Sequence, residues 1–277
     1  MLGSRVYRKG TKKLPTLVFL HGLLGSSEDW RICIKKLKPF QCIGIDLPGH
    51  GESRFVSCED FEHCDQLVRS TLEHHIQDDT PVVLIGYSLG ARIVMHGLVS
   101  GIYDAFNLHA AVIEGGNFGL INDEQKMQRL RNDEQWASRF ESEKIEQVLL
   151  DWYTQPVFSS LNHEQRQNLI QKRSDNLGES VARMLVATSL AKQEFLLDKL
   201  KALSMRVHYV CGSKDTKFSR LAAQSQLSYS EVNGAGHNVH QEQPEIFSQV
   251  IRSIISESDS EPNAGDKAKL ESPWLKQ

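Results

Sequence analysis

A serine stands between two glycines in Gly86-Tyr87-Ser88-Leu89-Gly90, directly after an apolar run and directly before a helical pattern. A strand that turns sharply into a helix at the pattern G-x-S-x-G lifts the serine hydroxyl clear of the backbone, at the carboxyl end of a sheet. The turn leaves no room for side chains at its flanks, which accounts for the two glycines. The pattern therefore predicts a reactive serine at Ser88.

An aspartate and a histidine follow later in the chain, each just past the end of a predicted strand. Asp215 lies in CGSKDTKF, and His237 lies in the glycine-rich NGAGHNVH. A serine hydroxyl needs a neighbouring imidazole to take its proton, and the imidazole needs a carboxylate that fixes its tautomer and balances its charge. We therefore expect Ser88, Asp215 and His237 to meet at one edge of the sheet as a catalytic triad.

Two backbone N–H groups are candidates for stabilising a negatively charged oxygen. The N–H of Leu89 stands at the start of the helix after Ser88, where unpaired amides gather. The loop HGLLGSSEDW follows the first apolar run and supplies the N–H of Leu23 as the second candidate. His21 of this loop and His50 of DLPGHGES are expected to make structural hydrogen bonds rather than to act in catalysis.

Short apolar runs rich in β-branched residues alternate with helical patterns along the chain. Such alternation predicts an α/β fold with a mostly parallel sheet, because parallel strands need helical crossovers and are buried on both faces. The expected strands are 16–20, 42–47, 82–87, 110–115, 206–212 and, more weakly, 228–232.

The alternation stops between residues 117 and 195, where every pattern is helical. Asn122 and Asn162 are good N-caps for two of these helices. We expect a helical lid inserted between two strands, with an additional helical layer without function as the alternative. The expected division is an α/β core in two parts, 1–116 and 196–256, the lid 117–195 and a disordered tail 257–277.

Charge and composition exclude other classes of function. The net charge of −3, from 32 basic and 35 acidic residues, lacks the basic excess of a nucleic-acid binder. No apolar stretch approaches the roughly 18 residues that a membrane helix needs. The five cysteines form no C-x-x-C pair and indicate reduced thiols in a cytoplasmic protein. The oligomeric state stays open, a monomer included.

No metal ion or cofactor is predicted. His240 follows His237 by three residues, but no cysteine or carboxylate set accompanies the two histidines. Metal sites in proteins usually draw on such a set. We therefore expect His240 to be structural.

Together these motifs resemble the α/β-hydrolase superfamily, in which serine, acid and histidine follow one another in this order. The closer resemblance is to the 2-succinyl-6-hydroxy-2,4-cyclohexadiene-1-carboxylate (SHCHC) synthase family, MenH, of menaquinone biosynthesis. It covers about residues 14–255, and its most specific parts are GYSLGAR and DWYTQPVFSSL. The other matching stretches are VFLHGLLGSSEDW, DLPGHGES, VIEGGNFGL, RNDEQWASRF, KRSDN, MLVATSLA and CGSKDTKF.

The resemblance implies a lyase that eliminates pyruvate from 2-succinyl-5-enolpyruvyl-6-hydroxy-3-cyclohexene-1-carboxylate, a small tricarboxylate. Arginine suits bidentate carboxylate recognition, and Arg92 follows Ser88 by one helical turn. The family match implies further substrate contacts at Tyr87, Arg129, Trp152 and Arg173. Core packing of the lid is the alternative for Trp152.

The resemblance also implies a role for the triad in elimination. Ser88, activated by His237 and Asp215, would take the proton next to the succinyl ketone, and the N–H groups of Leu23 and Leu89 would hold the enolate oxygen. The main alternative is a C–C or ester hydrolase of the same fold that acts on a small anionic substrate. A ligand-binding protein without catalysis is a second alternative, against which the complete triad argues.

Overall fold

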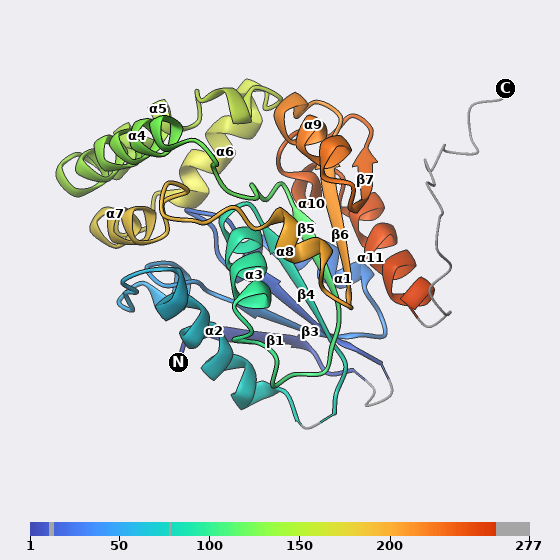
Figure 1. Cartoon of the computed structure of the whole chain (residues 1–277). Coiled ribbons are helices and arrows are strands. Elements are labelled where there is room, and N and C mark those ends of the chain that lie inside the picture. The colour runs from blue at the N-terminus through green and yellow to red at the C-terminus, as the bar shows by residue number, and fades with distance from the viewer. Residues whose placement is uncertain (11–13, 78, 259–277) are drawn as a thin grey trace, which may run out of the picture.

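A computed structural model gives the fold for residues 1–10, 14–77 and 79–258 (Figure 1). At its centre is a seven-stranded sheet of order β1-β3-β2-β4-β5-β6-β7. Every neighbouring pair is parallel except the edge pair β1–β3. The strands are β1 (Ser4–Arg8), β2 (Thr16–Leu20), β3 (Gln41–Ile45), β4 (Val82–Tyr87), β5 (Leu108–Glu114), β6 (Arg206–Gly212) and β7 (Ser228–Val232). The predicted α/β architecture is confirmed.

All six predicted strands are present, and β1 adds a seventh. Every residue of β2 and β4 is buried, as a strand covered on both faces requires. The sequence did not predict β1 because SRVYR is largely polar and only partly buried, as suits an edge strand. Strand β3 ends at Ile45, before the predicted Leu47, because Asp46 opens a loop. Its carboxylate accepts the N–H groups of Ser27 and Glu52 at 2.6 and 2.9 Å.

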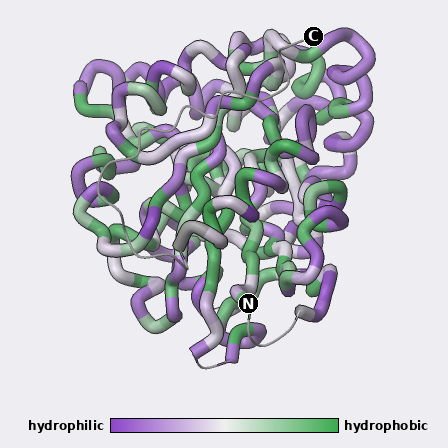
Figure 2. The backbone as a smooth tube through the Cα atoms, turned by 90° about the vertical axis from the view of Figure 1, so that its right-hand side faces the viewer, coloured by the Kyte–Doolittle hydropathy of each residue, from purple (hydrophilic) through white to green (hydrophobic). Residues whose placement is uncertain are grey.

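Helices cover both faces of the sheet, and each face has its own hydrophobic cluster. Figure 2 shows the hydrophobic residues concentrated inside and the hydrophilic ones around them. One face carries α1 (Arg31–Lys36), α10 (Val239–Glu242) and α11 (Pro244–Ser258). The other carries α2 (Phe61–His75), α3 (Leu89–Val99), α8 (Leu197–Lys201) and α9 (Thr216–Ser225). Short 3-10 helices span η1 (Ser27–Trp30) and η2 (Gly51–Ser53).

A helical insert separates β5 from β6 and has a hydrophobic core of its own. It forms the group of helices at the upper left of Figure 1. Asn122 caps the first helix by accepting the N–H of Glu124 at 2.7 Å, and Asn162 caps another through a reciprocal capping box with Gln165. The insert contains α4 (Asp123–Ser142), α5 (Ile145–Trp152), η3 (Pro156–Phe158), α6 (His163–Arg173) and α7 (Gly178–Ala187).

Three further predictions concern the chain as a whole. None of the helices in the described residues is long and apolar enough to cross a membrane. All five cysteines are free and buried. Of the predicted tail 257–277, the first two residues belong to α11, and the part from 259 onward lies outside the described residues.

Candidate active site

Ser88 occupies the turn between β4 and α3 with φ 50° and ψ −105°, a strained conformation for a residue other than glycine. A Cβ atom at Gly86 would lie 2.5 Å from the carbonyl oxygen of Gly90, and one at Gly90 would lie 2.2 Å from that of Leu20. The Ser88 N–H donates to the carbonyl of Glu114 at 2.8 Å, which ties the turn to β5. The close packing of this turn therefore requires both glycines.

Asp215 and His237 come together beyond the ends of β6 and β7. Nδ1 of His237 lies 2.6 Å from Oδ2 of Asp215, and both side chains are buried. This pairing leaves Nε2 of the imidazole to accept a proton. Ser88 borders the same cavity, although no hydrogen bond joins it to His237 in the described residues. Such catalytic contacts are often long without substrate and tighten when it binds.

The two candidate oxyanion donors border the same cavity. Leu89 is the first residue of α3, and Leu23 lies in the loop after β2. Within the described part of the chain, neither N–H has a hydrogen-bond acceptor. Unpaired amides beside a cavity are available to a developing negative charge.

His21 and His50 make the structural hydrogen bonds expected of them. Nε2 of His21 accepts the N–H of Leu47, and Nε2 of His50 accepts the N–H of Leu24, both at 2.9 Å. Burial lowers the pKa of His21, and it lowers the pKa of His50 to about 3. Both rings are therefore neutral acceptors that shape the loops around the site.

A cavity of about 430 Å³ lies between the sheet and the helical insert. All ten predicted site residues line it: Leu23, Tyr87, Ser88, Leu89, Arg92, Arg129, Trp152, Arg173, Asp215 and His237. Four charged residues of the wall were not among the predicted contacts: Asp29, Asp133, Lys214 and Lys217. Five cationic side chains and three carboxylates therefore surround the cavity.

Arg92 projects from α3 and is only 8 % exposed. Its Nη1 donates to the carbonyl of Thr188 at 2.8 Å, and its guanidinium lies 5.5 Å from the ring centroid of Phe61. Burial and the nearby charge of Arg129 lower its pKa to about 9. No carboxylate pairs with it in the described residues. A buried cation without a counter-ion is suited to receive an anionic ligand.

Arg129 projects from α4 and is already paired. Its Nε donates to both carboxylate oxygens of Asp133, at 2.8 and 2.9 Å, and the hydroxyl of Ser189 donates to the same carboxylate at 2.7 Å. The two Nη atoms of Arg129 have no partner among the described residues. The spacing of four residues on one helix is a signal from which Asp133 could have been found.

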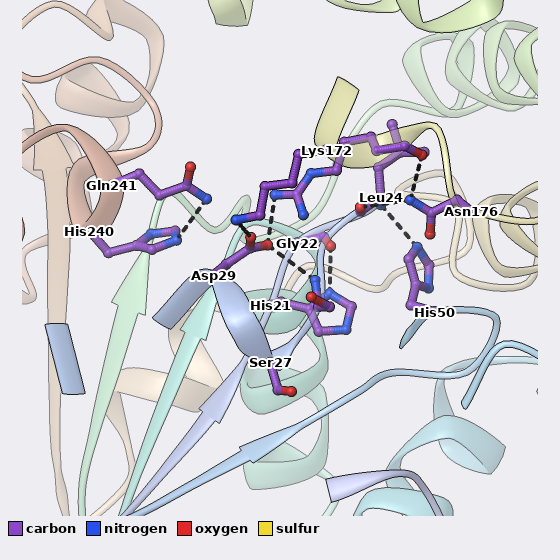
Figure 3. A network of polar contacts seen from close by, with 12 residues as sticks. His21, Gly22, Leu24, Ser27, Asp29, His50, Lys172, Asn176, His240 and Gln241 are labelled. Atoms are coloured by element: carbon purple, nitrogen blue, oxygen red, sulfur yellow. Dashed lines mark hydrogen bonds and ion pairs between the residues drawn. The ribbon is translucent and has the colours of Figure 1, made fainter. Parts of the chain in front are cut away.

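Arg173, at the end of α6, pairs with Asp29 of the core and also interacts electrostatically with Tyr153 of the insert. Its Nη2 donates to Oδ2 of Asp29 at 2.7 Å. Lys172 donates to Oδ1 of the same carboxylate at 2.5 Å (Figure 3). Burial alone would raise the pKa of Asp29, but the two cations lower it overall. The Nε of Arg173 is buried without a partner. No sequence signal links residues 144 positions apart, so Asp29 was missed.

Aromatic rings complete the wall. The ring of Tyr87 is buried and lies 5.3 Å from that of His237 and 4.9 Å from that of His240. Trp152 packs edge-on against Trp136 at 5.0 Å and also borders the cavity. Trp152 therefore both packs in the core of the insert and borders the cavity.

His240 is held by protein groups. Its Nδ1 and its backbone N–H lie 2.8 and 3.0 Å from the carboxylate of Glu114, and its ring stacks on Trp30 at 4.1 Å. Among the residues that the structure describes, no group of three or more histidine, cysteine, aspartate or glutamate side chains could hold a metal ion. His240 thus belongs to the packing behind Tyr87.

The chain is similar to known proteins over most of its length. Residues 17–250 match the model of the alpha/beta hydrolase family. The SHCHC synthase of Serratia proteamaculans is 40% identical over 255 residues, which cover 92% of this chain and 98% of that protein. The SHCHC synthase of Pectobacterium atrosepticum is 42% identical, with 87% of this chain and 94% of that protein covered.

A solved structure is similar as well. MenH from S. aureus superimposes with a TM-score of 0.85 at 24% identity, covering 94% of this chain and 100% of that one. The match spans the sheet and the insert alike, because almost the whole chain is covered. By sequence and by fold, the chain belongs to the SHCHC synthase family of α/β hydrolases.

Proposed function

We propose that this protein eliminates pyruvate from 2-succinyl-5-enolpyruvyl-6-hydroxy-3-cyclohexene-1-carboxylate to give SHCHC in menaquinone biosynthesis. The relatives of the chain carry the name of this synthase. The observation that supports it most directly is the cavity in which a strained serine and an Asp–His pair border several guanidinium groups. The free buried thiols suit the reducing cytoplasm, where we place the reaction.

The charge of the cavity suits a substrate with several carboxylates. Its five cationic side chains exceed its three carboxylates by two. Arg92 lacks a carboxylate partner in the described residues, and Arg129 retains unpaired Nη atoms. A neutral ester would leave these groups without an anion to bind, whereas a tricarboxylate would use them. We propose that 117–195 acts as the lid that supplies two of the three arginines.

Elimination begins with proton transfer. His237, oriented by Asp215, takes the hydroxyl proton of Ser88, whose oxygen removes the proton next to the succinyl ketone. The electrons move onto the ketone oxygen, where the N–H groups of Leu23 and Leu89 stabilise the enolate. When the ketone re-forms, a double bond forms between C2 and C3 of the ring, the existing double bond shifts from C3–C4 to C4–C5, and the C5–O bond breaks, so that enolpyruvate leaves. Protonation of the departing group yields pyruvate.

Release of pyruvate tests the proposal. Freshly made substrate is supplied, pyruvate is followed through coupled lactate dehydrogenase, and a reaction without enzyme gives the spontaneous rate. We expect strong acceleration that Ser88→Ala reduces by about 10³-fold or more. Ser142→Ala, on the exposed face of α4, is the matched control and should keep full activity. A folded protein that does not accelerate the reaction, or a Ser88→Ala variant with full activity, would overturn the proposal.

Ester or C–C hydrolysis is the other chemistry of which this triad is capable. A hydrolase would attack the carbonyl carbon with Ser88 and pass through a covalent acyl-enzyme. Intact-mass spectrometry during turnover separates the two reactions. In the elimination, the protein mass stays unchanged while pyruvate accumulates; an acyl adduct on Ser88 during turnover would favour the hydrolase.

A further inference from the structure

The loop after β2 is held from two sides (Figure 3). On the core side, Leu24 donates its N–H to Nε2 of His50 at 2.9 Å. Within the loop, the carbonyl of Gly22 accepts the N–H of Gly25 at 2.9 Å and lies 2.7 Å from Nδ1 of His21. These contacts fix the residues on both sides of Leu23, whose own N–H stays unpaired in the described residues.

The helical insert holds the same loop through three side chains close together in sequence. Arg173 and Lys172 of α6 bind the two oxygens of Asp29 at 2.7 and 2.5 Å. Asn176, in the turn after α6, donates from Nδ2 to the carbonyl of Leu24 at 3.1 Å. Asp29 connects α6 to the loop backbone, because its Oδ2 also accepts the N–H of Ser26 at 3.1 Å.

Leu24 is the strained point of this loop, with φ 65°. A residue other than glycine stays in the left-handed region only when its surroundings over-determine it. Here the N–H is held from the core by His50, and the carbonyl is held from the insert by Asn176. If the insert loosens, the peptide units of Leu24 can relax, and the adjacent Leu23 N–H moves with them.

We propose that Asp29 and Asn176 are positioning residues, through which the end of α6 holds the oxyanion donor Leu23 in place. This inference rests on the proposed function, because it takes the Leu23 N–H as an oxyanion donor. It gives Arg173 a second role beside substrate contact, as the partner of Asp29. When α6 packs against the loop after β2, the same contact then places both Arg173 in the wall of the cavity and the N–H of Leu23 at the oxyanion site.

Asp29→Asn separates positioning from substrate binding. The variant keeps the side-chain shape but leaves Arg173 and Lys172 unneutralised, so the attraction for an anionic substrate persists. We expect kcat to fall about 10- to 100-fold with KM unchanged or lower, since displacing a donor costs less than removing one, which costs about 10²–10³-fold. If KM rises while kcat stays the same, Asp29 serves only to orient Arg173 for binding, and the proposal is wrong.

Asn176→Ala keeps the test decisive even if Asp29→Asn fails to fold. Asn176 touches the carbonyls of Leu24 and Arg173 and does not border the cavity. We expect kcat to fall about 3- to 10-fold at unchanged KM. The matched control is Asn162→Ala, which removes the N-cap at the opposite end of α6. It should lower the melting temperature but leave kcat unchanged; an equal loss of kcat would assign the effect to helix stability and overturn the proposal.

Hydrogen exchange of the loop amides gives a readout independent of turnover. We expect exchange within residues 22–26 to quicken in Asn176→Ala and to stay at the wild-type rate in Asn162→Ala. Unchanged exchange in both variants would overturn the positioning role even if the wild type is an active lyase. Conversely, faster exchange in a protein that releases no pyruvate would retain the structural coupling and refute the proposed function alone.

Discussion

The core side and the insert side of the cavity are built on different physical principles. On the core side, Ser88 and the N–H groups of Leu23 and Leu89, unpaired in the described residues, are placed by backbone geometry at the carboxyl ends of strands. On the insert side, Arg129 and Arg173 are placed by ion pairs. The core thus fixes the proposed reacting groups through the sheet, while the insert arranges charge through side chains that can change partners.

Arg92 is the exception that defines this contrast. It belongs to the core helix α3, yet it is a cation of the cavity, and no carboxylate forms an ion pair with it in the described residues. Under the proposed function, the arginines of the insert exchange a protein carboxylate for a substrate carboxylate, whereas Arg92 only gains one. We therefore expect changes on the core side to reduce kcat, changes among the cations to raise KM, and Arg92 to give the largest change in KM.

The largest effect is expected from His237→Gln, which removes the proposed proton acceptor of the core side. We expect kcat to fall about 10³- to 10⁴-fold with KM changed only a few-fold, because substrate carboxylates still find their cations. Steady-state pyruvate release measures both constants. The control is His96→Gln, which changes a partly buried histidine that does not border the cavity and should leave kcat intact. If KM changed more than kcat, the claim that the core side determines kcat and the cations determine KM would be wrong.

Arg92→Gln should give the next largest effect. Loss of a charge-assisted, buried contact costs about 2–3 kcal/mol, which corresponds to a KM raised about 30- to 150-fold. The matched control is Arg131→Gln on the exposed face of α4, which should change KM less than twofold. Equal KM values for wild type and Arg92→Gln would show that Arg92 is only a packing residue between Thr188 and Phe61.

Gly115→Ala tests whether the close packing around the imidazole of His237 matters for turnover. Gly115 has φ 58°, and a Cβ atom there would lie 2.8 Å from Cε1 of His237. We expect about 1–2 kcal/mol of lost stability from the left-handed conformation and a roughly tenfold lower kcat from the displaced imidazole. Urea unfolding and pyruvate release measure the two effects.

Gly234→Ala is the matched control for that substitution. Gly234 also has positive φ, at 77°, but the nearest atom to an added Cβ is Nε2 of Gln243 at 4.0 Å. The stability loss should therefore be similar, with kcat unchanged. If both substitutions lower kcat alike, backbone strain at the two glycines, and not contact with His237, accounts for the loss.

The sequence predicted the core side of the cavity better than the insert side for a physical reason. Strand–turn–helix geometry is local, so the glycines around Ser88 and the strand ends before Asp215 and His237 are legible in short stretches of sequence. Apolar runs of the right length predicted six strands of the sheet, and only the half-polar edge strand β1 was not predicted.

The partners of the arginines did not follow in the same way. Asp133 lies four residues after Arg129, a local signal that was present but not used. Asp29 and Arg173 meet only because the insert folds back on the loop after β2, and nothing in either stretch encodes that approach. Charged side chains are mostly solvated, so neither their burial nor their pairing can be inferred from residue type alone.

The smallest effect is expected in the pH dependence of stability, to which Asp29 and His96 should contribute with opposite sign. Ion pairing with Arg173 and Lys172 outweighs burial and lowers the pKa of Asp29 below its ordinary 3.8. Its contribution is therefore present above pH 3.8 and is lost as the pH falls further. Burial opposes the charge on His96, but the hydrogen bond and charge of Asp65 raise its pKa above the ordinary 6.5. That contribution is present below pH 6.5 and is lost as the pH rises through the folded-state pKa.

Urea unfolding between pH 3 and 8 for wild type, Asp29→Asn and His96→Gln measures both signs. Asp29→Asn should flatten the acid limb of the stability curve by about 1 kcal/mol, because only the upper part of that titration lies above pH 3. His96→Gln should flatten the fall above pH 6.5. If Asp29→Asn leaves the acid limb unchanged, the contact between the insert and the core is not governed by the Asp29 ion pairs. The insert would then be held by its apolar contacts, and its arginines would be free to follow the substrate.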